Sequence, residues 1–193
     1  MKPIHKPTSP YFSCGPTKKP PGWNPRKLSL KNISRYHRSD SAQKYLNGLL
    51  NKLKNFLKIP KEYNIFLTPG SCTGAMESVI WSVLNNEIKI TSIVYDYWGL
   101  EWSRSIEKLN LKQDIRSSLN GEMPNLENIN INDDIVFVWT GTTTGMSLNN
   151  LNWLSSSHAG LVICDANSSV FIYDIEWNKI DITVFSWQKA LGS

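Results

Sequence analysis

The sequence predicts an α/β fold with three layers, in which a mainly parallel β-sheet is covered by helices on both faces. Short β-branched apolar segments alternate with longer segments whose apolar residues recur at steps of three and four, the spacing of an amphipathic helix. The short segments are apolar on both faces, which is typical of strands buried in a parallel sheet. With 193 residues, of which 40% are hydrophobic, the chain is long enough to form one such core.

The N-terminal part, residues 1–40, should form an extended arm, since it is rich in proline, lysine and serine. From Ser41 the pattern changes. Residues 42–59 (AQKYLNGLLNKLKNFLKI) have the apolar spacing of an amphipathic helix with lysines on its solvent side. Pro60 should end this helix, because proline cannot continue the backbone hydrogen bonding.

Strands and helices alternate along the rest of the chain. Strands are predicted at 64–70, 91–96, 112–118, 134–140, 161–167 and 181–187. Helices are predicted at 73–85 and 99–110. Five apolar residues of the first of these helices should face inward: Met76, Val79, Ile80, Val83 and Leu84.

The net charge of +5 is distributed unevenly. Residues 1–60 hold 13 Lys/Arg and one acid, a balance of +12, whereas residues 61–193 hold 8 Lys/Arg and 15 acids, a balance of −7. Such an arm could bind nucleic acid or a membrane surface. A solvated basic face is the favoured interpretation, because no nucleic-acid-binding motif accompanies the charge. A third interpretation is that some of these cations bind an anionic small molecule.

Cysteine usage and the N-terminus indicate a cytoplasmic protein. The three cysteines are far apart and form no CxxC pair, which favours a reducing compartment and argues against a zinc site or any other metal site. The opening MKPIHKPTSPYFS is interrupted by three prolines and lacks the apolar core of a signal peptide. No apolar stretch reaches the ~18 residues that a membrane-spanning helix needs.

Polar and reactive side chains follow the predicted strands where each strand ends. They are Gly70–Gly74 after the first, Asp96–Trp98 after the second, Thr140–Thr144 after the fourth, Asp165 in the fifth and Gln188–Lys189 after the sixth. The carboxyl ends of parallel strands meet at one edge of a sheet, and ligands bind there. We therefore expect these side chains to lie together.

Three of these features have a specific chemical use and also an ordinary structural explanation. The PGSCTGAMES segment leaves backbone N–H groups at a helix N-terminus, where phosphate binds, but a plain glycine-rich connection has the same composition. Asp165 ends an apolar strand and needs a cation or several donors, although an Asx turn or a helix cap would also explain it. Lys189, flanked by Trp187 and Leu191, is a candidate nucleophile, whereas most single lysines extend to solvent.

Taken together, these features are the parts of a pyridoxal phosphate site. A lysine forms a Schiff base with the cofactor, and an acid keeps its pyridine nitrogen protonated so that the ring can accept electrons. A helix N-terminus binds the phosphate, and an aromatic ring such as Trp98 stacks on the cofactor. The combination is more specific than any of its members.

Seven motifs follow one another along nearly the whole chain: FSCGPTKKPPGW, YHRS, PGSCTGAMES, YDYWGLEW, WTGTTTG, ICDANSS and FSWQK. Together they resemble the class V, fold type I aminotransferases, and within them the phosphoserine aminotransferases. The resemblance implies an aspartate aminotransferase-like large domain with pyridoxal 5′-phosphate as cofactor. It also implies amino transfer between L-glutamate/2-oxoglutarate and 3-phosphohydroxypyruvate/O-phospho-L-serine, in serine biosynthesis.

The resemblance gives roles to individual residues. Lys189 corresponds to the Schiff-base lysine, Asp165 to the acid at the pyridine nitrogen, and Trp98 to the aromatic residue that stacks on the ring. Further cofactor contacts correspond to Cys72, Thr73, Thr142 and Gln188. His37 and Arg38 correspond to a pair whose arginine binds a substrate carboxylate, a bidentate role that suits guanidinium.

Members of this family continue well past the lysine. The resemblance therefore implies that residues 1–40 are a basic arm, that residues 41–193 are an incomplete cofactor-binding large domain, and that a C-terminal small domain is absent. We expect an N-terminal fragment that is inactive alone, from an enzyme that is a homodimer when complete. In that fold a late strand lies between the strand predicted at 64–70 and the lysine strand, so the former would lose a neighbour here.

Two alternatives stay open. The first is another class V enzyme, such as an alanine–glyoxylate aminotransferase or a cysteine desulfurase, although FSCGP and YHRS favour the phosphoserine branch. The second, from a different class, is a nucleic-acid-binding module built on the basic arm. The favoured interpretation predicts small-molecule substrates and neither nucleic acid nor membrane as a partner.

Overall fold

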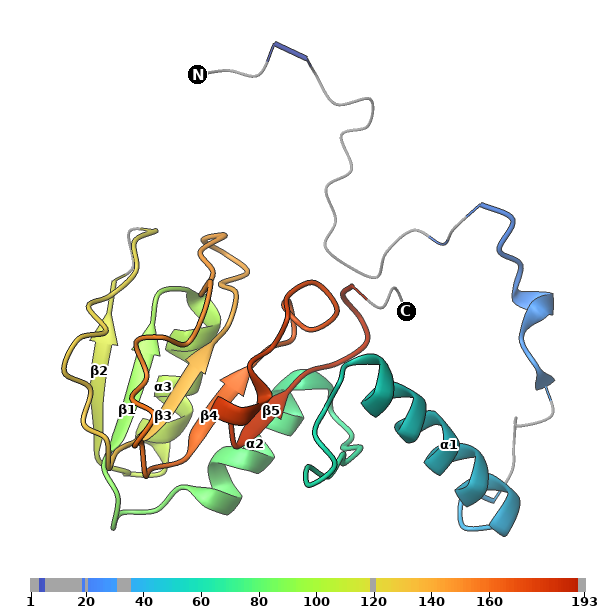
Figure 1. The fold of residues 1–193 in the computed structure, drawn as a ribbon, viewed down its shortest axis with the longest axis horizontal. Coiled ribbons are helices and arrows are strands. Elements are labelled where there is room, and N and C mark those ends of the chain that lie inside the picture. The colour runs from blue at the N-terminus through green and yellow to red at the C-terminus, as the bar shows by residue number, and fades with distance from the viewer. Residues whose placement is uncertain (1–3, 6–18, 20, 31–35, 119–120, 191–193) are drawn as a thin grey trace.

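A computed structural model of the chain describes residues 4–5, 19, 21–30, 36–118 and 121–190. Its five described strands form one parallel sheet in the order β2-β1-β3-β4-β5 (Figure 1). The strands are β1 Ile90–Val94, β2 Gln113–Ser117, β3 Asp134–Val138, β4 Val162–Asp165 and β5 Ile182–Val184. Among the described residues, the α-helices are α1 Asp40–Phe56, α2 Ser71–Val83 and α3 Tyr97–Lys108, and 3₁₀ turns lie at η1 Pro25–Lys27 and η3 Trp177–Lys179.

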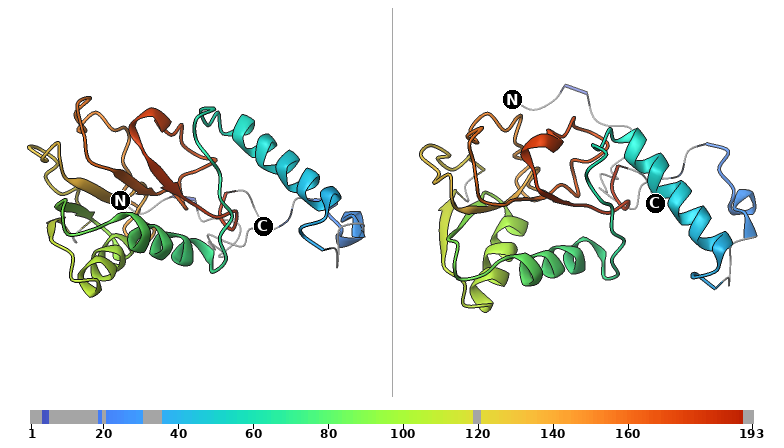
Figure 2. Two further views of the ribbon diagram at one scale, coloured as in Figure 1. Left: turned by 90° about the horizontal axis from the view of Figure 1, so that it is seen from below. Right: turned by 60° about the horizontal axis from the view of Figure 1, so that its bottom comes forward.

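The α/β class and the parallel sheet are confirmed, with one difference in the layers. Helices α2 and α3 cover one face of the sheet (Figure 2). The other face is covered mainly by irregular segments, which contribute buried residues such as Leu148, Leu151 and Val170. Among the described residues, the connection from β3 to β4 contains no helix, so the predicted third layer is made of packed loops.

Helix α1 lies apart from these layers. It has no buried residue among those described, and it extends away from the sheet (Figure 1). Its C-terminal end is the part that docks: the Trp177 indole N–H donates to the carbonyl of Leu57 at 2.9 Å, and the rings of Phe56 and Phe171 lie 6.0 Å apart. Ser39 caps its other end by accepting from the N–H of Ala42.

The strand predicted at 64–70 is wrong. The structure has no strand there, and Phe66 is 81% exposed. A strand needs a neighbour to accept and donate its backbone hydrogen bonds. The sheet of the described residues ends at β5, and none of its strands pairs with this segment. The apolar run NIFL is therefore an extended connection from α1 to α2.

The strand order creates a switch point next to the centre of the sheet. After β1 the chain crosses to β2 on one side through α3, and it then returns to place β3 on the other side of β1. The loops that leave β1 and β3 therefore diverge, and ligands of open α/β sheets bind in the crevice between such loops. The two loops meet at one hydrogen bond, from the N–H of Tyr97 to Thr143 Oγ1 at 3.1 Å.

Candidate functional site

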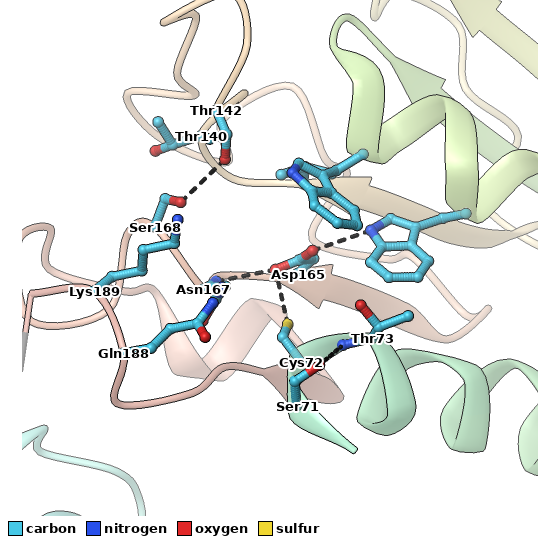
Figure 3. Close-up of a pocket in the computed structure, with 13 residues that line it drawn as sticks. Ser71, Cys72, Thr73, Thr140, Thr142, Asp165, Asn167, Ser168, Gln188 and Lys189 are labelled. Atoms are coloured by element: carbon cyan, nitrogen blue, oxygen red, sulfur yellow. Dashed lines mark hydrogen bonds between the residues drawn. The ribbon is translucent and has the colours of Figure 1, made fainter. Parts of the chain in front are cut away.

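A pocket lies at the carboxyl ends of β3 and β4, beside the N-termini of α2 and α3 (Figure 3). Seven of the nine predicted site residues line it: Cys72, Thr73, Trp98, Thr142, Asp165, Gln188 and Lys189. Six further residues complete its wall: Ser71, Trp102, Val138, Thr140, Asn167 and Ser168. The expectation that these side chains gather at one edge of the sheet is confirmed.

Asp165 lies at the bottom of this pocket. It is the last residue of β4, its side chain is 5% exposed, and burial raises the pKa of its carboxyl group. Three donors oppose that effect. The N–H of Asn167 and the thiol of Cys72 donate to Oδ1 at 3.0 and 3.5 Å, and the indole N–H of Trp102 donates to Oδ2 at 3.0 Å.

The bond from Asn167 forms an Asx turn, which is the ordinary structural explanation of Asp165. The turn is present, and it does not account for the other two donors, which come from helices distant in sequence. Asn167 also uses its side-chain oxygen, which accepts from the N–H of Ser186 at 2.9 Å and from its hydroxyl at 2.7 Å. This residue therefore connects the end of β4 to the segment that carries Lys189.

Two tryptophans from α3 form one wall. Asp96 caps this helix by accepting from the N–H of Gly99 at 2.8 Å, and the cap sets where the first turn begins. Trp98 and Trp102 are four positions apart, so they lie on the same face of the helix. Their ring centroids are 5.8 Å apart with an interplanar angle of 28°, which is a stacked arrangement.

The N-terminus of α2 forms the opposite wall. The turn into this helix has a left-handed backbone at Gly70 and at Ser71, with φ of 90° and 64°. A Cβ at Gly74 would lie 2.7 Å from the carbonyl oxygen of Pro69, so the turn can close this tightly only with glycine. The first turn of a helix attracts anions through its backbone N–H groups. Cys72 and Thr73 lie in this turn, and the N–H of Thr73 donates to Ser71 Oγ at 3.3 Å.

The remaining wall is polar. The hydroxyls of Thr142 and Ser168 lie 3.2 Å apart and connect the loops after β3 and β4. Lys189 is half-buried, and Figure 3 shows its side chain running toward Ser168, with Gln188 beside it. The Lys189 amine is close enough to the Cys72 thiol to lower its pKa, although burial, the dominant cause, keeps that pKa well above the usual range.

His37 and Arg38 are not brought to this pocket. Both are exposed and precede the Ser39 cap of α1, at the end of the helix that lies away from the sheet (Figure 1). A helix of 17 residues is roughly 25 Å long, so its two ends cannot both reach one small site. The role predicted for this pair is not supported within one copy of the chain.

The sequence-based prediction missed several residues that the pocket contains. Trp102 and Asn167 are the most informative of them, because each donates to the Asp165 carboxylate. One signal was available for Trp102, which follows Trp98 by one helical turn and so had to share its face. No comparable signal existed for Asn167, because its side chain bonds to a residue 19 positions later.

The donor set fits pyridoxal phosphate and gives no indication of a metal. A carboxylate, an amine, a flat indole and the N-terminus of a helix, where anions bind favourably, surround one space. In the part of the chain that the structure describes, no three His, Cys, Asp or Glu side chains gather as a metal ion would require. None of the described helices has the length and hydropathy needed to cross a bilayer.

Comparison with known proteins shows a relative that matches the chain from end to end. The phosphoserine aminotransferase of Methanosarcina mazei is 38% identical over 194 residues, which cover 100% of this chain and 52% of that protein. The chain thus spans about half the length of the curated relatives it matches. No family model matches the chain.

Solved structures show the same fold. The phosphoserine aminotransferase from Bacillus circulans subsp. alkalophilus has a TM-score of 0.78 and 16% identity, over 94% of this chain and 54% of that one. The pyridoxal phosphate-bound phosphoserine aminotransferase from Trichomonas vaginalis has a TM-score of 0.72 and 14% identity, over 94% and 55%. An alanine–glyoxylate aminotransferase from Nostoc sp. has a TM-score of 0.76 and 19% identity, over 100% and 52%. The chain therefore shares its fold with about half of each of these aminotransferase chains.

Proposed function

We propose that this chain is the cofactor-binding part of a phosphoserine aminotransferase. The enzyme would transfer an amino group between L-glutamate/2-oxoglutarate and 3-phosphohydroxypyruvate/O-phospho-L-serine, with pyridoxal 5′-phosphate as cofactor. The observation that carries this proposal is the meeting of Lys189, Asp165 and Trp98 with the N-terminus of α2 in one pocket. Identity of 38% to a phosphoserine aminotransferase along the whole chain supports this activity over the others of the fold.

Each wall of the pocket would contact a different part of the cofactor. The N-terminus of α2, at Cys72 and Thr73, would bind the phosphate through backbone N–H groups and the helix dipole. Trp98 would cover one face of the ring, and Asp165 would accept from the protonated ring nitrogen. Thr142 and Gln188 would supply further polar contacts at the rim.

Pyridoxal phosphate, when bound, supplies an electron sink for the bond that breaks at the substrate Cα. The chain supplies the groups that move protons and hold charge. Lys189 would first carry the cofactor and then, with its amine released, take the proton from the substrate Cα as a general base. Asp165, buried with three donors around it, would keep a negative charge at the ring nitrogen while electrons move toward that end.

The test uses the full-length protein that contains this chain. Pyridoxal phosphate is added, the complex is reduced with borohydride, and the modified lysine is identified by mass spectrometry. Modification of Lys189, its loss in Lys189→Ala, and its persistence in the exposed control Lys112→Ala are expected. Modification that is unchanged in Lys189→Ala would overturn the assignment.

Substrate choice is tested on the same protein. The Nostoc alanine–glyoxylate aminotransferase has a comparable TM-score, so the fold alone does not separate that activity from phosphoserine transamination. Amino transfer from O-phospho-L-serine to 2-oxoglutarate should exceed transfer from L-alanine to glyoxylate by at least an order of magnitude. The reverse preference would replace the phosphoserine assignment and leave the cofactor assignment in place.

The proposal retains the role of His37 and Arg38 in substrate binding. These residues would reach the pocket of a second copy of the chain. Both residues lie at the far end of α1 from their own pocket. An arginine that binds substrate would then belong to the partner's site, so the complete enzyme would be a homodimer. Light scattering on the full-length protein measures this, and a monomer with full activity would contradict it.

The arrangement of the complete protein follows from the same proposal. Residues 1–40 would be a basic arm and residues 41–193 the cofactor-binding large domain, and a small domain would complete the site. A cytoplasmic location is supported by Cys72 and Cys164, which are free thiols in the structure. Fractionation of cells that express the full-length protein tests the location directly.

A further inference from the structure

Trp102 contacts two groups of the proposed cofactor site with one side chain. It lies on α3 and is 2% exposed. Its indole N–H donates to Asp165 Oδ2 at 3.0 Å, and its ring stacks on Trp98 at 5.8 Å between centroids. The residue therefore connects the acid at the bottom of the pocket with the aromatic ring in its wall.

The two oxygens of Asp165 are not equivalent. Oδ1 accepts from Asn167 and from Cys72, so both of its lone pairs are in use. Oδ2 accepts from Trp102 and keeps one lone pair for a ligand. Donors on both oxygens fix the rotation of the carboxylate, and Trp102 is the donor on the oxygen that would face a bound ring.

We propose that Trp102 is a positioning residue, which orients Asp165 toward the ring nitrogen of the cofactor and holds the plane of Trp98 against the ring. This inference rests on the function proposed above and deepens it. The competing explanation is that Trp102 only fills the core between α3 and the sheet. The two differ in one respect, because a core-filling indole does not need its N–H.

Trp102→Phe separates the two explanations, since phenylalanine keeps an aromatic ring and removes the N–H. The bond from Trp102 lowers the pKa of Asp165, against the larger raising effect of burial. Without it, the carboxyl group is protonated at a higher pH and is no longer held in one rotation. Affinity for a protonated ring should fall roughly 10-fold or more, the effect expected when a hydrogen bond to a charged group is lost.

Trp177→Phe is the matched control. The Trp177 side chain is 8% exposed, and its indole N–H donates to the carbonyl of Leu57 at 2.9 Å, outside the pocket. This variant also loses one largely buried indole hydrogen bond and so costs comparable stability. Its affinity for the cofactor should stay within about 3-fold of the parent protein, because its bond is made to a neutral carbonyl away from the ligand.

The experiment titrates the full-length protein with pyridoxal phosphate and with 4′-deoxypyridoxine phosphate, which has no aldehyde and cannot react with Lys189. Kd is measured from pH 6 to pH 8.5, and unfolding is followed in parallel. Trp102→Phe should weaken the binding of both ligands, and the loss should be larger at low pH than at high pH, because losing this bond favours the protonated form of Asp165, which cannot pair with a protonated ring nitrogen. Combined with Asp165→Asn, the substitution should have little further effect.

Each result has one meaning. If Trp102→Phe binds both ligands as Trp177→Phe does at every pH, the inference is wrong and the proposed function stands. If the parent protein binds neither ligand, the proposed function itself fails. Trp102→Met, which fills the space without a donor, provides the same comparison if the phenylalanine variant does not fold.

Discussion

Gly141 should not tolerate even a methyl group, although its backbone conformation is ordinary. It is buried in the loop after β3, and a Cβ there would lie 2.7 Å from Asp96 Cβ and 2.7 Å from Thr144 Oγ1. Ordinary contact begins at 3.4 Å, so each neighbour would have to move by 0.7 Å, the difference between 3.4 and 2.7 Å. Asp96 cannot move that far and still cap α3 through the N–H of Gly99.

The cost can be worked out from these two effects. Overpacking costs about 1–3 kcal/mol and loss of an N-cap about 1 kcal/mol, so Gly141→Ala should lower the free energy of unfolding by roughly 2–4 kcal/mol. In a chain of this size the melting temperature should fall by about 5–15 °C. The start of α3 also carries Trp98, so affinity for pyridoxal phosphate should fall together with stability.

Gly48→Ala is the control for this prediction. Gly48 lies within α1, and nothing would lie within 4 Å of its Cβ. Alanine there should stabilise the helix by about 0.5–1 kcal/mol. Urea unfolding followed by tryptophan fluorescence compares the two variants. The reasoning is refuted if Gly141→Ala unfolds at the same urea concentration as the parent protein while Gly48→Ala is stabilised.

Three further predictions concern the bond between Asn167 and the segment that carries Lys189, the thiol of Cys72 and the carboxyl group of Asp134. Asn167→Ala removes the acceptor of two hydrogen bonds from Ser186, in the segment that carries Lys189. The fraction of bound cofactor that borohydride links to Lys189 should therefore fall several-fold more than the total amount of cofactor bound. Asn167→Asp, which keeps an acceptor, should restore most of the linked fraction. Burial and the neighbouring carboxylate raise the pKa of the Cys72 thiol well above its usual range. Iodoacetamide at pH 8 should therefore label this cysteine at least about 10-fold more slowly in the folded protein than in urea, and equal rates would contradict its burial. Burial also raises the pKa of the Asp134 carboxyl group in the folded protein above its value in the unfolded chain. The contribution of Asp134 to the free energy of unfolding is therefore complete below the pKa of the unfolded chain and is lost as the pH rises through the pKa of the folded protein. Asp134→Asn keeps an acceptor for the N–H of Leu161 without that loss, and urea titrations should show its stability relative to the parent increasing from pH 4 to pH 7.

Local patterns predicted the regular elements well where one chain segment determines its own structure. The helix predicted at 73–85 is observed as α2 Ser71–Val83, and Met76 and Ile80 are buried as expected. The helix begins two residues earlier than predicted, because the left-handed backbone at Gly70 and Ser71 turns the chain into the helix before Thr73. Such a turn depends on a close approach to the Pro69 carbonyl, which no periodicity reveals.

Non-local pairing explains why the strand predicted at 64–70 is wrong. The segment 64–70 has the composition of a strand, but whether it becomes one depends on a neighbour elsewhere in the chain, and β5 is the edge of the described sheet. For His37 and Arg38, the motif did not reveal that they lie at the far end of a helix of 17 residues, and their role in substrate binding stays a prediction. In contrast, Trp98, Thr142 and Asp165 lie at or just after the ends of β1, β3 and β4, and the common edge of these parallel strands brings them to one pocket.

The buried carboxylate of Asp165 explains why these distant segments meet. An ionised group that is 5% exposed is costly unless donors surround it. Its donors come from α2 through Cys72, from α3 through Trp102 and from the following loop through Asn167. The same charge that would pair with a cofactor thus holds both helices against the end of β4. Neutralising it as asparagine would leave an N–H₂ facing a donor on one side, because donors occupy both oxygens. The acid therefore stabilises the shape of its own pocket, and Asp165→Asn should loosen the site as well as remove its charge.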